Sequence, residues 1–310
     1  MKRLLTGLQP SGQLHIGNYF GALKPFVDTY QDYESFLMVA DYHSLTSLKD
    51  PKALRENIYE IVRAYLAAGV DPNKAVIFKQ SDVQEHTELA WIFECLVTVP
   101  FLELAHAYKD KVAKGLEANA GLFNYPMLMA ADILLYETEV VPVGKDQQQH
   151  VEYAREAANK FNNAYGQTFK EPEAKILETV ATVPGIDGQK MSKSYKNTIP
   201  LFAPKEEVAK AVMSIVTDSE GKNPVNLLAI HKLFRSESEL DGPYGAGGNY
   251  KQLKEMLTAD IETVVGPMRA KYEAITDEQV KEVLAKGAEK AKAITSAKMA
   301  DVRQKVGVSL

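Results

Sequence analysis

Two polar segments carry residue types that could handle a phosphate group. The first, GLQPSGQLHIGN, covers residues 7–18 and joins a short apolar run to a helical pattern. Free backbone N–H groups at a helix start favour an anion. His15 could donate a hydrogen bond to it, and Gly17 would let a nucleotide approach the backbone closely. By itself the segment predicts only a general anion site, because a lone histidine before a helix is more often structural. The chain has neither GxxxxGK[ST] nor GxGxxG, the usual phosphate-binding loops.

The second segment is KMSKS, residues 190–194, in a polar stretch without apolar periodicity. Alone, such a stretch is typical of a solvated loop. The stretch also contains Gly185 and Gly188, and the motif itself has two lysines and two serines.

Strand patterns and helix patterns alternate along the first 150 residues, and these elements must position the two segments. Apolar runs of strand length cover residues 4–8, 35–40, 75–78 and 139–144. Helical patterns cover residues 17–30, 51–68, 85–108 and 124–136, and another begins at residue 146. This alternation predicts an α/β fold with a doubly wound parallel sheet, which binds ligands beyond the carboxyl ends of its strands.

Strand patterns stop after about residue 200. Helices are expected at residues 204–217, 226–233, 250–262 and 267–273, and a capping box of Thr276 and Gln279 begins a long final helix. We therefore expect a Rossmann-like catalytic domain in residues 1–200, including the KMSKS loop. We expect a second, all-helical domain in residues 201–310, whose last helix can pack back on the first domain.

Composition narrows the class of protein further. The 310 residues carry a formal net charge of −5, which argues against broad nonspecific nucleic-acid binding. Cys95 is the one cysteine, so no intrachain disulfide forms, and its apolar neighbours predict a buried thiol. We find no signal peptide and no apolar run of transmembrane length. The sequence thus predicts a cytoplasmic protein without a membrane anchor.

HIGN and KMSKS, in this order, resemble the signature of the class I aminoacyl-tRNA synthetases. Asn18 stands where the general HIGH motif has histidine. The segments GLQPSGQLHIGNYFGAL, YPMLMAADILLY, VPVGKDQQQHVE and KMSKS narrow the resemblance to the bacterial tryptophanyl-tRNA synthetases. The resemblance covers roughly the whole chain and is strongest over residues 1–200.

The resemblance implies a two-step reaction. L-tryptophan and ATP would give tryptophanyl adenylate and pyrophosphate, and the acyl group would then move to tRNA(Trp). It implies Mg²⁺ that arrives with ATP and is held mainly by phosphates, with no protein metal site. It also implies a homodimer, for which the apolar residues 90–104 are a candidate interface, and a helical domain that reads the anticodon.

The resemblance also assigns roles at the phosphate site. The implied catalytic residues are His15, Asn18, Lys190 and Lys193. The implied ATP-binding residues are Gln9, Pro10, Ser11, Gly17, Asn18, Lys111, Gly144, Lys145, Asp146, Val183, Lys190, Met191, Ser192, Lys193 and Ser194. Among these, Asp146 starts a helix, where it either accepts from ribose hydroxyls or merely caps the helix. For Lys111, the alternative to phosphate binding is a side chain that is simply solvated.

Asp132 is the sharpest candidate for amino-acid recognition. A carboxylate on an apolar helix face is costly without a partner, and the resemblance supplies the indole N–H of tryptophan. A buried acceptor also rejects phenylalanine, by about ten-thousandfold in comparable sites. The other implied tryptophan-binding residues are Gly7, His43, Tyr125, Met129, Ile133, Val141, Val143 and Gln147. For the apolar ones, ordinary core packing explains the pattern equally well.

Three other interpretations remain at this point. A tyrosyl-tRNA synthetase shares the fold and also uses an aspartate for its substrate. A small nucleotidyltransferase uses a similar histidine motif but needs neither KMSKS nor a helical domain. A noncatalytic synthetase relative could bind tRNA or tryptophan as a regulator, although His15, Asn18, Lys190 and Lys193 are all present.

Overall fold

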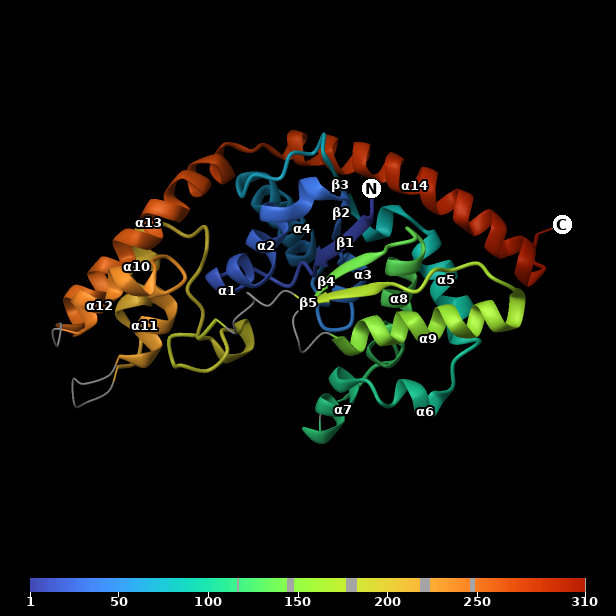
Figure 1. Ribbon diagram of the computed structural model, residues 1–310, viewed down its shortest axis with the longest axis horizontal. Helices are drawn as coiled ribbons and strands as arrows, with labels where there is room; N and C mark the ends of the chain where they lie inside the picture. Colours follow the sequence, from blue (N-terminus) through green and yellow to red (C-terminus); the bar gives the residue numbers. More distant parts are fainter. Residues whose placement is uncertain (116, 144–147, 177–182, 218–223, 246–248, 310) are drawn as a thin grey trace.

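A five-stranded parallel sheet forms the centre of the computed structural model (Figure 1), which describes residues 1–115, 117–143, 148–176, 183–217, 224–245 and 249–309. The spatial order of the strands is β3-β2-β1-β4-β5. Their bounds are β1 Arg3–Leu8, β2 Glu34–Val39, β3 Ala75–Lys79, β4 Val140–Val143 and β5 Glu173–Ile176. The predicted α/β class is confirmed, and β5 is a strand that the sequence patterns did not reveal.

The order of the strands locates the binding edge. The chain places β2 and β3 on one side of β1, and then returns to place β4 and β5 on the other side. The strand order therefore reverses between β1 and β4. Doubly wound sheets bind ligands beyond the carboxyl ends of the strands at such a reversal.

Alternating side chains of the strands build a core on each face of the sheet. One core contains Leu4, Leu37 and Ile77 and packs against α2 (Lys24–Thr29) and α4 (Pro51–Ala67). The other contains Leu5, Phe36 and Phe78 and packs against α5 (Glu85–Glu94), α8 (Ala120–Leu134) and α9 (Gln148–Tyr165). Because both faces are covered, the strands are continuous apolar runs, as predicted.

The helices of the first 200 residues differ from their predicted bounds in three places. The helix expected at residues 17–30 contains a π turn at Tyr19–Leu23. The helix expected at residues 85–108 divides into three, with Pro100 near the start of the second. A cap by Asn119 starts α8 earlier than predicted. The bounds are α1 Ile16–Asn18, α2 Lys24–Thr29, α3 Asp41–Ser44, α4 Pro51–Ala67, α5 Glu85–Glu94, α6 Val99–Leu102, α7 His106–Ala113, α8 Ala120–Leu134 and α9 Gln148–Tyr165.

The prediction for Cys95 was wrong. Its thiol is exposed at the carboxyl end of α5, next to Trp91, whose side chain is 67% exposed. The apolar sequence around it does not describe core here, because part of this segment lies on the outer surface.

Only helices follow residue 200 in the described residues. They are α10 Lys205–Met213, α11 Val225–His231, α12 Glu237–Gly245, α13 Tyr250–Ala274 and α14 Asp277–Val306. The capping box of Thr276 and Gln279 is confirmed. The predicted break before Pro267 is wrong, because α13 continues through this proline with Ile261 and Val265 buried on one face.

The last helix, α14, runs back over the β3 side of the sheet (Figure 1). Gly287 makes this packing possible, since a Cβ at this position would lie 1.7 Å from the Ile77 carbonyl oxygen in β3. Further along α14, Lys298 pairs with Glu137 and Arg303 with Glu88. The helix thereby covers the edge strand of the sheet.

Replacing Gly287 with alanine is expected to lower the free energy of unfolding by about 1–3 kcal/mol, because the backbone of β3 has to shift to admit the methyl group. Thermal or urea unfolding followed by circular dichroism measures this. On the exposed face of the same helix, Ala293→Ser should change the stability by less than about 0.5 kcal/mol. Equal stability of Gly287→Ala and the wild type would contradict the close packing.

Candidate active site

Three sequence-predicted side chains, those of His15, His43 and Asp132, lie at the carboxyl edge of the sheet together with Gln80, which the sequence analysis did not select. His15 follows β1, His43 lies in α3 directly after β2, and Gln80 directly follows β3. Asp132 lies in α8, which leads into β4. The edge selected from the strand pattern therefore holds these side chains, and His43, Gln80 and Asp132 are in direct contact there.

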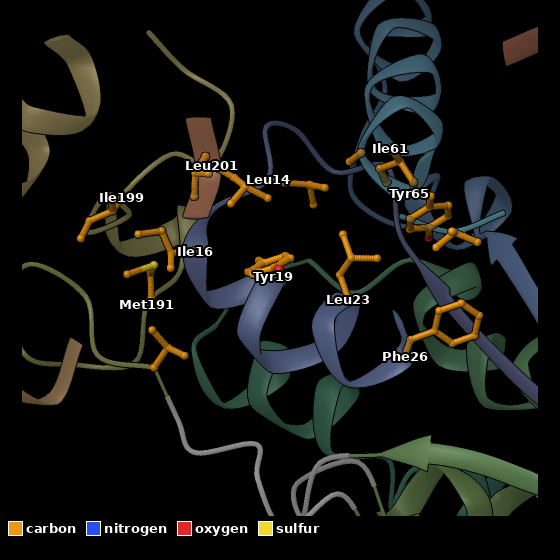
Figure 2. Close-up of a cluster of buried hydrophobic side chains, with 14 of the residues drawn as sticks. Leu14, Ile16, Tyr19, Leu23, Phe26, Ile61, Tyr65, Met191, Ile199 and Leu201 are labelled. Atoms are coloured by element: carbon orange, nitrogen blue, oxygen red, sulfur yellow. The ribbon is translucent and has the colours of Figure 1, made fainter. Parts of the chain in front are cut away.

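The two polar motif segments are joined through their backbones. Ile16 N donates to Ile199 O over 3.0 Å, and Leu201 N donates to Leu14 O over 2.9 Å. Figure 2 shows the side chains of Ile16, Met191, Ile199 and Leu201 close together in one hydrophobic cluster. This pairing brings the KMSKS region beside the helix start at His15, although the two motifs are far apart in the sequence.

His15 has the environment of a neutral hydrogen-bonding group. Its ring is buried, and Nδ1 has no hydrogen-bond partner. Burial, together with the nearby positive charge of Lys193, lowers the pKa of His15 to about 4. Gly17 leaves room for this ring, since a Cβ there would lie 2.9 Å from Nδ1. The Asn18 side chain accepts from the His15 backbone N–H at 3.1 Å and so supports the turn.

An NMR titration should show that His15 stays neutral down to about pH 4. The sign follows from burial, which penalises the charged ring, so protonation requires a lower pH than for a free histidine. The ring signal can be assigned among the 6 histidines by its loss in His15→Asn. A titration midpoint near the ordinary value of about 6.5 would contradict this environment.

Asn197 organises the KMSKS loop. Its Oδ1 accepts from Ser192 N at 2.8 Å, and its Nδ2 donates to Lys190 O at 3.1 Å and to Asp187 Oδ1 at 2.7 Å. Asn197 is buried, so these bonds are shielded from water. Sequence reasoning missed this residue, because its only signal was an asparagine in a polar stretch three residues after the motif.

Lys193 reaches back to the first segment. Its Nζ donates to Gly12 O at 2.7 Å, and burial lowers the pKa of this lysine while the charge of Glu60 opposes the shift. Lys190 and Ser194 are exposed. Lys111 lies in α7, near the carboxyl end of this helix.

The other residues implied to bind ATP lie partly inside and partly outside the described residues. Gln9, Pro10 and Ser11 form a turn after β1, in which Ser11 N donates to Gln9 O and Pro10 O accepts from Asn57 Nδ2. Val183 and Met191 are buried and joined by a backbone hydrogen bond. Gly144, Lys145, Asp146 and Gln147 lie outside the described residues, as does the side chain of Val143.

Asp132 is the centre of a buried polar network. It is 1% exposed, its Oδ2 lies 2.7 Å from His43 Nε2, and its Oδ1 accepts from Gln80 Nε2 at 2.7 Å and lies 2.6 Å from His86 Nδ1. Burial alone raises the pKa of this carboxyl. The electrostatic interaction and hydrogen bond of His43, with the hydrogen bond of His86, outweigh it and lower the pKa to about 2.

This network changes the argument for Asp132. The sequence required a partner for a carboxylate on an apolar helix face, and the protein itself supplies three donors. Gln80 and His86 were missed. Only their positions in the sequence could have indicated them, because Gln80 directly follows β3 and His86 lies in the first turn of α5.

The other implied pocket residues lie in three different environments. Tyr125 and Met129 are half-buried on α8, and the Tyr125 ring meets the His43 ring edge-on with centroids 6.3 Å apart. Ile133 and Val141 are fully part of the core. Gly7 is exposed on the central strand β1, and a Cβ there would lie 2.7 Å from Met38 O.

The fold and this site are those of a class I aminoacyl-tRNA synthetase, and the chain belongs to that family. A family model described as "tRNA synthetases class I (W and Y)" matches residues 1–285. The tryptophan--tRNA ligase of Fusobacterium nucleatum is 51% identical over 99% of this chain and 98% of its own. That of Campylobacter jejuni is 48% identical over 99% of this chain and 100% of its own.

Solved structures agree with these relatives. The tryptophanyl-tRNA synthetase of Campylobacter jejuni, in complex with ADP and tryptophan, matches with a TM-score of 0.91 and 46% identity over 98% of this chain and 99% of that chain. The tyrosyl-tRNA synthetase of Archaeoglobus fulgidus, at 19% identity, shares the fold alone. The chain therefore groups with the tryptophan--tRNA ligases, and the resemblance inferred from HIGN and KMSKS is confirmed.

Proposed function

We propose that this chain activates L-tryptophan with ATP and then transfers the tryptophanyl group to tRNA(Trp). The observation that carries the proposal is the joining of the two motif segments at one edge of the sheet. Backbone bonds link residues 14–16 to residues 199–201, and Lys193 reaches Gly12. The high identity to tryptophan--tRNA ligases supports the choice of amino acid.

The geometry suits adenylate formation. The tryptophan carboxylate attacks the α-phosphorus of ATP, a new oxygen–phosphorus bond forms, and the bond to the β-phosphate oxygen breaks to release pyrophosphate. His15, neutral and with Nδ1 unpartnered, is suited to contact a phosphate oxygen. Lys190 and Lys193 balance the charge on the leaving group. Asp132 accepts the indole N–H.

Mg²⁺ is proposed to arrive with the nucleotide. In the part of the chain that the structure describes, no group of three or more His, Cys, Asp or Glu side chains is arranged to hold a metal. Phosphate oxygens and water are ligands that Mg²⁺ prefers. The ion would lower the negative charge that Lys190 and Lys193 face.

Further partners follow from the proposed activity. Residues 201–310 are proposed to carry the anticodon-binding surface, beside a catalytic domain in residues 1–200. Trp91, Val99 and Leu104 are exposed apolar side chains within residues 90–104 and support a homodimer there, which analytical ultracentrifugation tests. No described helix is long and apolar enough to span a membrane. We place the enzyme in the cytoplasm, where translation consumes charged tRNA.

Amino-acid-dependent ATP–pyrophosphate exchange tests the proposal. Exchange with tryptophan, followed by charging of tRNA(Trp), is expected. Strong exchange with tyrosine alone would overturn the assignment of the amino acid. Binding of tryptophan or tRNA without turnover would instead support a regulatory relative.

A further inference from the structure

We propose that His86, oriented by Tyr136, is a positioning residue that makes Asp132 selective for the indole N–H of tryptophan. The inference rests on the proposed function. The sequence analysis gave neither residue a role, although Tyr136 ends the segment YPMLMAADILLY, and both side chains are fully buried. They act through Asp132 and not through contact with the substrate.

The three side chains form a continuous chain of hydrogen bonds. Tyr136 Oη lies 2.9 Å from His86 Nε2, and His86 Nδ1 lies 2.6 Å from Asp132 Oδ1. His86 belongs to α5, and Asp132 to α8, which packs against it. Aromatic rings surround the chain: the Phe78 ring stacks on His86 at 6.1 Å, and the Phe36 ring lies 5.2 Å from Tyr136. Water is thereby kept away from these bonds.

The direction of each hydrogen bond follows from the chemistry of the groups. The Asp132 carboxylate can only accept, so His86 Nδ1 carries the hydrogen between them. A neutral imidazole then has a lone pair at Nε2, which accepts from the Tyr136 hydroxyl. Burial raises the pKa of Tyr136, so this hydroxyl keeps its proton and remains a donor. Tyr136 therefore selects the imidazole tautomer that donates to Asp132.

The two oxygens of Asp132 are used differently. Oδ1 has Gln80 and His86 as donors, which occupies both of its lone pairs. Oδ2 has only His43 among the described residues and retains one acceptor direction. The Gln80 amide is oriented in turn, because its Oε1 accepts from Tyr42 N at 3.1 Å. Two fixed donors on Oδ1 thus hold the carboxylate in one orientation, with Oδ2 available to a substrate N–H.

A structural role and a selective role predict different results. If His86 only helped α5 to pack against α8, its loss would weaken the binding of every ligand of the pocket to the same extent. If His86 positions Asp132, its loss weakens the binding only of ligands that donate a hydrogen bond to Oδ2. An isosteric pair of ligands separates the two: L-tryptophan, and L-β-(benzothiophen-3-yl)alanine, in which sulfur replaces the N–H.

The experiment compares the KM for tryptophan with the Ki of the benzothiophene analogue in tryptophan-dependent pyrophosphate exchange. In Tyr136→Phe we expect the KM for tryptophan to rise about tenfold, as for the loss of one buried hydrogen bond, with kcat within about twofold. The Ki of the analogue should stay within about twofold of the wild type. The ratio of Ki to KM therefore falls about tenfold.

Substitutions of His86 provide a second test. His86→Leu removes the donor to Asp132 and should lower the ratio further, whereas His86→Asn keeps an N–H near the Nδ1 position and should restore most of it. The matched control is Tyr153→Phe, which deletes another buried hydroxyl from the same hydrophobic cluster, where it donates to Phe101 O. This control should leave the ratio unchanged. Circular dichroism melting confirms that each variant is folded.

The outcomes are distinct from those for the proposed function. Wild-type protein without tryptophan-dependent exchange would overturn the proposed function itself. Normal wild-type exchange, with a Ki-to-KM ratio that Tyr136→Phe leaves unchanged, would overturn the role of His86 and Tyr136. If Tyr136→Phe and His86→Leu weaken the binding of tryptophan and of the analogue equally, the positioning role is also overturned, because that result indicates a structural role.

Discussion

Asp132→Asn is expected to lower kcat/KM for tryptophan by about a thousandfold in pyrophosphate exchange. The geometry explains why an isosteric change is so costly. Gln80 and His86 both donate to Oδ1, so the amide oxygen of the asparagine must face them. The amide NH₂ then takes the place of Oδ2, where it meets His43 Nε2 and the indole N–H. A donor faces a donor, and the substrate N–H is left buried without an acceptor.

The loss should appear mainly in the KM for tryptophan, because the proposed partner of the carboxylate is the side chain of the amino acid and not the reacting phosphorus. Asp260→Asn is the matched control. Asp260 is also paired with a histidine, His231, and with Arg235, but it lies in the helical region on α13. It should change pyrophosphate exchange by less than about threefold. An unchanged tryptophan response in Asp132→Asn would remove Asp132 from its proposed role.

The second large effect is expected for Lys193→Met, which should lower kcat of pyrophosphate exchange by about a hundredfold to a thousandfold. Lys193 is half-buried and already reaches the first motif segment at Gly12. Methionine keeps much of the length of the side chain but removes the cation that we propose to stabilise the leaving pyrophosphate. The KM for tryptophan should change little, because the amino acid is bound by other groups.

Lys196→Met provides the control for Lys193. It removes the same charge three residues later, from an exposed position at the end of the same short helical turn. Its activity should stay within about threefold of the wild type. Equal activities of Lys193→Met and Lys196→Met would show that only the general positive charge of the loop matters.

Much of the architecture could be predicted because it depends on local patterns. Strand β2 is a continuous apolar run, and the capping box at Thr276 marks the start of α14; both are found where expected. Cys95 and Pro267 show the limit of such patterns. Whether an apolar segment faces the core or the surface, and whether a helix tolerates a proline, depends on what packs against it.

The sequence by itself determined the family and the type of reaction, because HIGN and KMSKS occur in a recognisable order along the chain. It also selected Asp132 as the candidate residue for recognising the amino-acid side chain. Only the tertiary structure decided how that carboxylate is held. Gln80 and His86 come from the β3 edge and α5, and Asn197 holds the KMSKS loop from behind. Gln80 and His86 are 52 and 46 positions away from Asp132 in the sequence. The spacing of residues along a chain does not indicate which buried donor will bond to which acceptor.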